Sequence, residues 1–299
     1  MTSSLTSGLL IVDKLRGPTS FAVVARVRRM VGGRSIAVGH AGTLDPLATG
    51  VLPVLVGEAT KLVPWLMGLD KEYVATVLLG VVTDSCDAEG QVLTTVDASA
   101  VTRADVQAAL AHFVGEIDQR PPLHSAIKHE GKKLYEMARA GIEFEPAARK
   151  VRIDEILLEE WSPPSVVLRV RCGKGTYIRS LARDLGERLG VGGHITALRR
   201  TRVGGLRAED GVDPFVLESL EGARWIPPAD AVAHLPALTI DAEVERRVRM
   251  GQQGVLATLD ALAAPESTTL RLLDTAGRLV AIIERGPNEP RWSIARVFV

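Results

Sequence analysis

Residues 39–50 read GHAGTLDPLATG, and residues 51–56 continue as the apolar run VLPVLV. The first segment is too irregular for a helix and too rich in glycine for a regular strand. Pro46 biases Asp45 away from helical backbone angles, so we expect Asp45 to lie on an ordered turn. The apolar run indicates a buried strand that would anchor this turn. A polar loop on a rigid apolar base is a common design for an active site.

Asp45 nevertheless has two interpretations. An aspartate before proline is frequent in turns, and Thr43 and Asp45 could serve only the local backbone amides. On spacing alone, this structural role is favoured over catalysis by about two to one. The residues of this segment by themselves therefore leave the role of Asp45 open.

The length of 299 residues predicts one large and one small domain. The proline-rich segment 226–236 is the best candidate for their boundary, which gives domains at 1–235 and 236–299. About 60 residues are marginal for independent stability, so we expect the second domain to lean on the first. The 36 basic and 36 acidic residues balance, so any nucleic-acid site must come from local clustering.

The expected cellular location rests on three features that the sequence lacks: zinc-ligand spacing, a signal peptide and a membrane-spanning segment. The two cysteines, Cys86 and Cys172, have no histidine partners at zinc-finger spacing, which suits a reducing compartment. The first eight residues lack the apolar core of a signal peptide, and no apolar run approaches the roughly 20 residues that span a bilayer. We therefore expect a cytoplasmic protein without membrane contact.

Caps, turn residues and apolar spacing predict the secondary structure. The expected helices lie at 20–31, 102–113, 131–141, 213–220 and 241–250, with a glycine turn and helix within 173–186. The expected strands lie at 9–12, 51–56, 72–82, 151–161, 166–172, 269–274, 278–284 and 292–299.

Basic residues gather between positions 169 and 207, where ten of them face only two acids. Such a cluster is typical of a surface that binds a polyanion. Arg179 belongs to it but follows apolar residues in the first turn of a helix, so it needs a partner near the core. Pairing with Asp45 and pairing with a phosphate or Asp184 are about equally favoured by the sequence.

Two further segments allow two interpretations each. Residues 83–90 contain three acids; a polar hairpin is favoured over a metal site because no histidine or further acid completes a ligand set. Residues 119–141 are basic and bounded by glycines and prolines, so they form either a mobile arm that closes on a ligand or a plain surface helix.

Five segments taken together resemble the bacterial tRNA pseudouridine-55 synthase family, the TruB type. They are 39–61, 71–73, 83–90, 119–141 and 172–186, in the family's order. The similarity continues into a C-terminal segment that resembles a PUA domain. One departure is Leu15, where the family usually has proline, and this difference concerns local turn geometry.

The resemblance implies an α+β fold: a mixed, largely antiparallel β-sheet catalytic core with flanking helices, plus a small β-rich PUA-like domain. It implies isomerisation of uridine 55 in the T-loop of tRNA, with no metal or cofactor and no obligate protein partner. Two other classes stay open at this point. A non-catalytic RNA-binding protein could use the same basic surface, and a related synthase could act on another RNA.

The resemblance also assigns roles by position. Asp45 becomes the catalytic nucleophile or base, Tyr73 stacks on the target base, and Arg179 pairs with Asp45. The remaining substrate residues are Leu198 in the pocket wall, Asp87 as a further polar pocket residue, and His40, which helps to expel the base and fill its place. The residues expected to hold RNA are Lys14 and an arm at about 120–150 with Lys128, Lys132 and Lys133.

Overall fold

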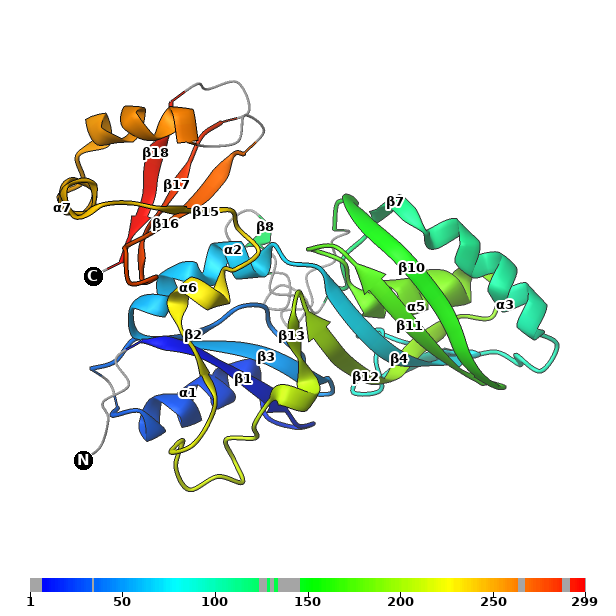
Figure 1. Cartoon of the computed structure of the whole chain (residues 1–299). Coiled ribbons are helices and arrows are strands. Elements are labelled where there is room, and N and C mark those ends of the chain that lie inside the picture. The colour runs from blue at the N-terminus through cyan, green and yellow to red at the C-terminus, as the bar shows by residue number, and fades with distance from the viewer. Residues whose placement is uncertain are drawn as a thin grey trace.

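The computed structural model describes residues 7–33, 35–123, 128–129, 132–133, 146–262, 267–286 and 291–298. A single large sheet of ten strands forms the main part of the molecule (Figure 1). In spatial order its main strands are β14 (Trp225–Ile226), β1 (Gly8–Lys14), β3 (Thr49–Val56), β12 (Gly193–Val203), β4 (Lys71–Leu79), β11 (Ser165–Cys172), β10 (Arg149–Ser162) and β7 (Gly115–Gln119). Strand β2 (Val38–His40) pairs with β3, and β13 (Leu206–Arg207) pairs with β12.

The helices and short hairpins lie around this sheet, except α7 and η4, which pack against the small C-terminal sheet described below (Figure 1). The α-helices are α1 (Ser20–Met30), α2 (Val63–Met67), α3 (Arg103–Leu110), α5 (Ile178–Arg188), α6 (Pro228–Ala231) and α7 (Ala242–Arg249). The 3-10 helices are η1 (Gly57–Leu62), η2 (Ala111–Phe113), η3 (Ala208–Asp210) and η4 (Gln253–Leu262). Two separate hairpins are β5 (Val81–Thr83) with β6 (Val92–Thr95), and β8 (Lys128–His129) with β9 (Lys132–Lys133).

The centre of the sheet is the one place where two of its strands run parallel. Strands β3 and β12 pair in parallel through Arg199 with Thr49 and Arg200 with Gly50, whereas the other pairs of this sheet are antiparallel. Gly50 has φ +102°, and a Cβ there would lie 2.1 Å from the Arg200 carbonyl oxygen. Glycine is therefore needed for this approach. The expected mixed, largely antiparallel core is confirmed.

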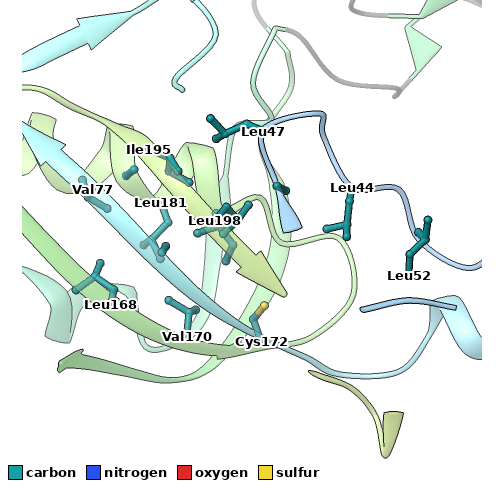
Figure 2. Packing of buried hydrophobic residues seen from close by; sticks show 14 of the residues in the cluster. Leu44, Leu47, Leu52, Val77, Leu168, Val170, Cys172, Leu181, Ile195 and Leu198 are labelled. Carbon is teal, nitrogen blue, oxygen red and sulfur yellow. The ribbon is translucent and has the colours of Figure 1, made fainter. Parts of the chain in front are cut away.

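The loop that carries Asp45 is anchored from both sides by buried leucines. Leu44 and Leu47 belong to the main hydrophobic core, together with Leu198 of β12 and Val77 of β4 (Figure 2). Burying each such side chain contributes roughly 1.5–3 kcal/mol. The backbone between the two leucines is therefore held against the sheet.

The N-terminal end of helix α1 contacts the same loop. The sequence offers Thr19 or Ser20 as the cap. In the structure Thr19 caps the helix by accepting a hydrogen bond from the backbone N–H of Ala22. The next residue, Ser20, is buried; its hydroxyl donates to the carbonyl of Leu44 and accepts from the Leu44 N–H, both at 2.9 Å. The start of α1 thus fixes the residue directly before Asp45.

The C-terminal residues form a second, four-stranded sheet. Its strands are β15 (Ala237–Thr239), β16 (Thr269–Leu273), β17 (Leu279–Glu284) and β18 (Ser293–Val297). Ile282 and Phe298 share a hydrophobic cluster with Leu62 and Leu66 of the main part. In addition, Trp65 Nε1 donates to a carboxylate oxygen of Glu284 at 2.8 Å. The small module leans on the large one as expected.

Three predicted elements differ from the structure. The predicted strand 72–82 ends at Leu79, because Gly80 has φ +85° and its carbonyl instead accepts from Val96. No helix forms at 213–220. Arg26 donates hydrogen bonds to the carbonyls of Pro214 and Leu217, which would accept backbone hydrogen bonds in a helix. Of the predicted helix 131–141, residues 132–133 form strand β9 and the rest lies outside the described residues.

None of the helices in the described ranges is both long and apolar enough to cross a membrane.

Candidate active site

A cavity of about 800 Å³ opens at the middle of the large sheet, beside the loop of residues 39–50. Its walls come from four parts of the chain that are distant in sequence. The side chains that matter for chemistry are Asp45 of the loop, Tyr73 of β4, Arg179 of α5, and Leu198 and Arg200 of β12. Four of these five were predicted as site residues.

Asp45 and Arg179 form the ion pair that was one of the two expectations. Arg179 Nε lies 3.0 Å from Asp45 Oδ2. The guanidinium is almost completely buried, whereas the Asp45 side chain is 39% exposed toward the cavity. Asp184, the alternative partner, binds Arg183 instead at 2.7 Å.

Asp87 lies behind Arg179, on the side away from the cavity. Its Oδ2 is 3.3 Å from Arg179 Nη1, and its Oδ1 accepts a hydrogen bond of 2.6 Å from the Ser85 hydroxyl. Arg179 also donates to the Ser85 carbonyl at 3.1 Å. Asp87 was expected to be a polar pocket residue; in this structure it does not line the cavity and instead holds the far end of Arg179.

Burial and the charges of Arg179 and Asp87 have the largest effects on the pKa of Asp45. Burial raises the pKa of Asp45, and the charge of Asp87 acts in the same direction. The guanidinium of Arg179 is the strongest opposing influence, because it favours the charged form of the carboxyl group. Arg179 thus favours the ionised form of a partly desolvated carboxylate whose pKa is raised overall, and it fixes the direction of that carboxylate.

Tyr73 and Leu198 provide the flat and apolar walls of the cavity. They lie on neighbouring antiparallel strands, where Tyr73 is paired with Arg200 and Leu198 with Ala75. Burial raises the pKa of the Tyr73 phenol, and the charge of Arg200 opposes this change. An aromatic face and a leucine beside a carboxylate make a slot suited to a planar ring.

Lys14 was expected to hold RNA, and its position requires a correction. The residue is 1% exposed, and its ammonium donates to the carbonyls of Leu15, Pro46 and Ala48 at 3.0, 3.3 and 2.6 Å. Burial lowers the pKa of Lys14 to about 8, while the negative charge of Asp45 opposes the change. Because all three donors of an ammonium are used in this way, Lys14 fixes the loop from beneath.

The other expected RNA contacts lie away from the cavity or outside the description. His40 pairs with Val54 at the end of β2 and is not among the residues that line the cavity. Its buried Nδ1 has no hydrogen-bond partner within the described ranges. Lys128, Lys132 and Lys133 belong to the β8–β9 hairpin, and the placement of their side chains lies outside the described features.

Six of the ten basic residues between 169 and 207 form ion pairs, five of them with acids outside this range and Arg183 with acids inside it. Arg199 forms a two-pronged pair with Asp13 at 2.8 and 3.0 Å, and Arg169 binds both Glu72 and Glu159. The members that are exposed and form no ion pair with a described residue are Lys174, Arg188 and Arg202. The charge count along the sequence therefore overstates the polyanion-binding surface.

Two residues that the sequence did not single out organise the site. Gln119 is buried; its amide donates to the Tyr177 carbonyl at 3.1 Å and accepts from the Tyr177 N–H at 2.8 Å, which fixes the start of α5. Arg200 crosses beneath the loop of residues 39–50 and reaches the carbonyls of Gly42 and Val51. The sequence features pointing to Arg200 are its membership of the basic cluster between 169 and 207 and its place two residues after Leu198.

Comparisons with known proteins agree with this geometry. Residues 28–178 match the model of the TruB family pseudouridylate synthase N-terminal domain, and residues 179–231 match a tRNA pseudouridylate synthase B C-terminal domain. The tRNA pseudouridine synthase B of Chromohalobacter salexigens is 43% identical over 95% of this chain and 93% of its own. That of Aromatoleum aromaticum is 46% identical over 87% and 82%, respectively.

Solved structures show the same fold. A chain from a Cbf5–Nop10–Gar1 complex superposes with a TM-score of 0.72 and 27% identity, covering 98% of this chain and 85% of that one. A chain from an H/ACA ribonucleoprotein bound to a substrate RNA containing 2′-deoxyuridine gives 0.71 and 25%, covering 99% and 86%.

The mixed sheet and the carboxylate-lined cavity at its centre therefore belong to a pseudouridine synthase fold with a small C-terminal β-sheet. Such enzymes are isomerases. Within this class, the chain belongs to the TruB family and is a tRNA pseudouridine synthase of the B type.

Proposed function

We propose that the chain converts uridine 55 in the T-loop of tRNA to pseudouridine, with Asp45 as the essential carboxylate. The observation that carries this proposal is the ion pair of 3.0 Å between Asp45 and Arg179 at the wall of the cavity that Tyr73 also lines. The target uridine leaves its stack and enters this cavity, because its C1′ and C5 atoms are otherwise out of reach of a side chain. A T-loop is already irregular, which lowers the cost of this step.

The reaction rearranges bonds within one nucleoside. The N1–C1′ bond breaks, the uracil turns, and C5 bonds to C1′. Asp45 acts on the reacting nucleoside as nucleophile or as base, and both roles require its ionised form. The guanidinium of Arg179, itself held by Asp87, supplies the positive charge that keeps this form available.

The uracil is held between Tyr73 and Leu198 while it turns. Both side chains line the cavity, and Leu198 is 8% exposed, so the ring meets a dry wall on that side. After rotation, the proton on C5 must leave, and the Tyr73 hydroxyl is the polar atom of this slot suited to accept it. The stacking face and the hydroxyl of Tyr73 thus have separate tasks.

RNA contacts outside the cavity complete the proposal. His40 helps to open the RNA, and Lys128, Lys132 and Lys133 of the arm bind its phosphates. Support comes from the base of the arm, where the Arg120 carbonyl accepts from the Ser180 hydroxyl at 2.7 Å and from Arg183 Nη2 at 3.0 Å. The arm is therefore joined to the helix that carries Arg179.

The position of the modified uridine tests the proposed substrate. The purified full chain is incubated with unmodified tRNA transcripts, and pseudouridine is mapped by chemical labelling and primer extension. We expect one modified site, at position 55. Pseudouridine at another position, or none in any transcript while the RNA still binds, would contradict the proposal.

The arm is tested by the salt dependence of RNA binding. Replacing Lys132 and Lys133 with glutamine should lower the slope of log K against log salt concentration by about 0.7–0.9 for each lost phosphate contact. Glu243→Gln, on exposed helix α7, is a charge-changing control at a residue paired with Arg246. An unchanged slope in the lysine variants would remove the arm from phosphate binding.

A further inference from the structure

Arg200 occupies the centre of the sheet, between the two strands that bring the catalytic residues together. On one side it pairs with Gly50 of β3, and on the other side with Tyr73 of β4. Residues directly opposite each other in an antiparallel pair project to the same face of the sheet. Arg200 and Tyr73 therefore share the face on which the cavity opens, and both line it.

The guanidinium of Arg200 is held by backbone carbonyls near both ends of the loop of residues 39–50. Its Nε donates to the Val51 carbonyl at 2.7 Å, and its Nη2 donates to the Gly42 carbonyl at 2.9 Å. The residue is only 2% exposed. Two anchored donors on a planar fork leave the group little freedom, so its remaining N–H groups point in a set direction.

Arg200 also lacks a carboxylate partner within the described part of the chain, unlike Arg179. Carbonyl dipoles are the nearest partners of its charge, and Asp45 interacts with it without forming an ion pair, so positive charge remains beside the Tyr73 phenol. A hydrogen bond from Arg200 and this charge both oppose the rise in the pKa of Tyr73 that burial causes. Other titratable groups that act on Tyr73 include Cys172 on β11 and Asp45 on the loop. The charged side chains of Lys71, Lys174 and Arg179 line the same cavity.

We propose that Arg200 is a positioning residue that orients the Tyr73 hydroxyl and stabilises negative charge on its oxygen, so that Tyr73 accepts the C5 proton. This inference rests on the proposed function. In that step the C5–H bond breaks and its electron pair forms the C5=C6 double bond. The electrons of the C6=N1 bond move to N1, which takes up a proton from water. Tyr73 enters this step as the phenolate, becomes the neutral phenol when it takes the C5 proton, and returns to the phenolate by releasing that proton to solvent.

A double-mutant cycle tests the coupling of the two residues. Single-turnover rates on a T-arm RNA are compared for the wild type, Arg200→Lys, Tyr73→Phe and the double variant. We expect Arg200→Lys to lower the rate about tenfold when Tyr73 is present, and by less than about twofold in the Tyr73→Phe background. Equal losses in both backgrounds would overturn the inference, because a purely structural role of Arg200 would slow both enzymes alike.

The pH titration of Tyr73 is a second measurement, because a purely structural role of Arg200 would leave its midpoint unchanged. The chain has three tyrosines, so 3-fluorotyrosine gives few fluorine resonances, and the one lost in Tyr73→Phe identifies Tyr73. In Arg200→Lys, the midpoint of the Tyr73 titration should move to higher pH, because the hydrogen bond from the guanidinium is lost. An unchanged midpoint would contradict the inference.

The outcomes for the inference and for the proposed function remain distinct. If Tyr73→Phe alone keeps a wild-type rate, the proton-accepting role of Tyr73 fails, and the inference fails with it. If Tyr73→Phe is slow but the Arg200→Lys effect is additive, only the inference fails. Where no Arg200 variant folds, the slowly exchanging guanidinium ¹H–¹⁵N signal of Arg200 should shift in Tyr73→Phe, and an unshifted signal would overturn the contact.

Discussion

Two buried arginines reach the cavity from opposite sides, and their surroundings differ. Arg179, on helix α5, lies between the carboxylates of Asp45 and Asp87. Arg200, on strand β12, is held by backbone carbonyls and by its neighbour Tyr73. One guanidinium is thus neutralised by acids, and the other keeps its charge.

In the proposed mechanism, this difference serves two chemical demands. Asp45 must stay ionised, and the proposal assigns Arg179 as the fixed cation beside it. Tyr73 must accept a proton, and the proposal assigns Arg200 as a cation that forms no ion pair with an acid of the described residues. The predictions below separate the two sides of the cavity.

The largest effect is expected on the Arg179 side. Arg179→Gln should reduce kcat/KM by about 100-fold or more, because the reactive carboxylate loses its charge partner and its orientation. Since Arg179 lowers the pKa of Asp45, removing it raises that pKa further, and the acid limb of the pH–rate profile should move to higher pH. Rates measured across pH on a T-arm RNA check both effects.

Arg179→Lys is the matched control for this prediction. It keeps a positive charge but loses the planar fork that reaches Asp45 and Asp87 together. We expect its acid limb to stay closer to that of the wild type. An acid limb that does not move in Arg179→Gln would show that Asp45 ionisation does not depend on this pair.

Among the variants near Arg200, we expect the largest effect from a substitution of Gly50, where the backbones of two strands meet. Gly50→Ala should destabilise the fold by about 2–4 kcal/mol, because its Cβ would meet the Arg200 carbonyl oxygen at 2.1 Å and φ is +102°. Urea unfolding measures the change. Gly277→Ala is the control: φ is +78°, but nothing lies within 4 Å, so it should cost only about 1–2 kcal/mol. Equal costs would mean that the contact with Arg200 is not limiting.

Local features of the sequence were reliable guides to part of this arrangement. The capped helix α1, the capping box of α3 and the strands on either side of the central cavity follow from spacing and turn residues. The loop of residues 39–50 was predicted as an anchored turn, and its buried leucines bear this out. The residues alone left the pair between Arg179 and Asp45 as one of two expectations. The family resemblance favoured it, and the fold places the two side chains 3.0 Å apart.

Contacts between residues that are distant in the sequence could not be predicted from it. Arg200 is buried because β3 and β12 run side by side, although its partner Val51 is 149 residues away. The helix expected at 213–220 is lost because Arg26, also distant in sequence, binds its carbonyls. Lys14 was expected from the resemblance to hold RNA, and only the packing beneath the loop shows that its ammonium donates to backbone carbonyls.

Asp87→Asn should have a smaller effect than Arg179→Gln. The carboxylate holds Arg179 from behind at 3.3 Å, so its loss lets the guanidinium shift while leaving its charge in place. We expect kcat/KM to fall by about tenfold, because small displacements of a catalytic group are costly. Steady-state kinetics on a T-arm RNA measure the loss. A loss as large as that of Arg179→Gln would indicate that Asp87 acts on the substrate directly.

The smallest effect is expected where the basic cluster is already neutralised. Arg169→Gln removes a charge that is paired with Glu72 and Glu159, so the salt dependence of tRNA binding should change by less than about 0.2 in slope. Lys174→Gln removes a charge at the rim of the cavity and should lower the slope by about 0.7–0.9. Similar changes in both variants would mean that the ion pairs of Arg169 open when RNA binds.

Pseudouridine formation by the Asp45→Asn variant is the most direct test of the carboxylate on which the Arg179 side depends. The substitution keeps the size of the side chain but removes its charge. On a T-arm RNA with uridine at position 55, we expect measurable binding and no pseudouridine above background. Robust product from Asp45→Asn would contradict the essential role of this carboxylate.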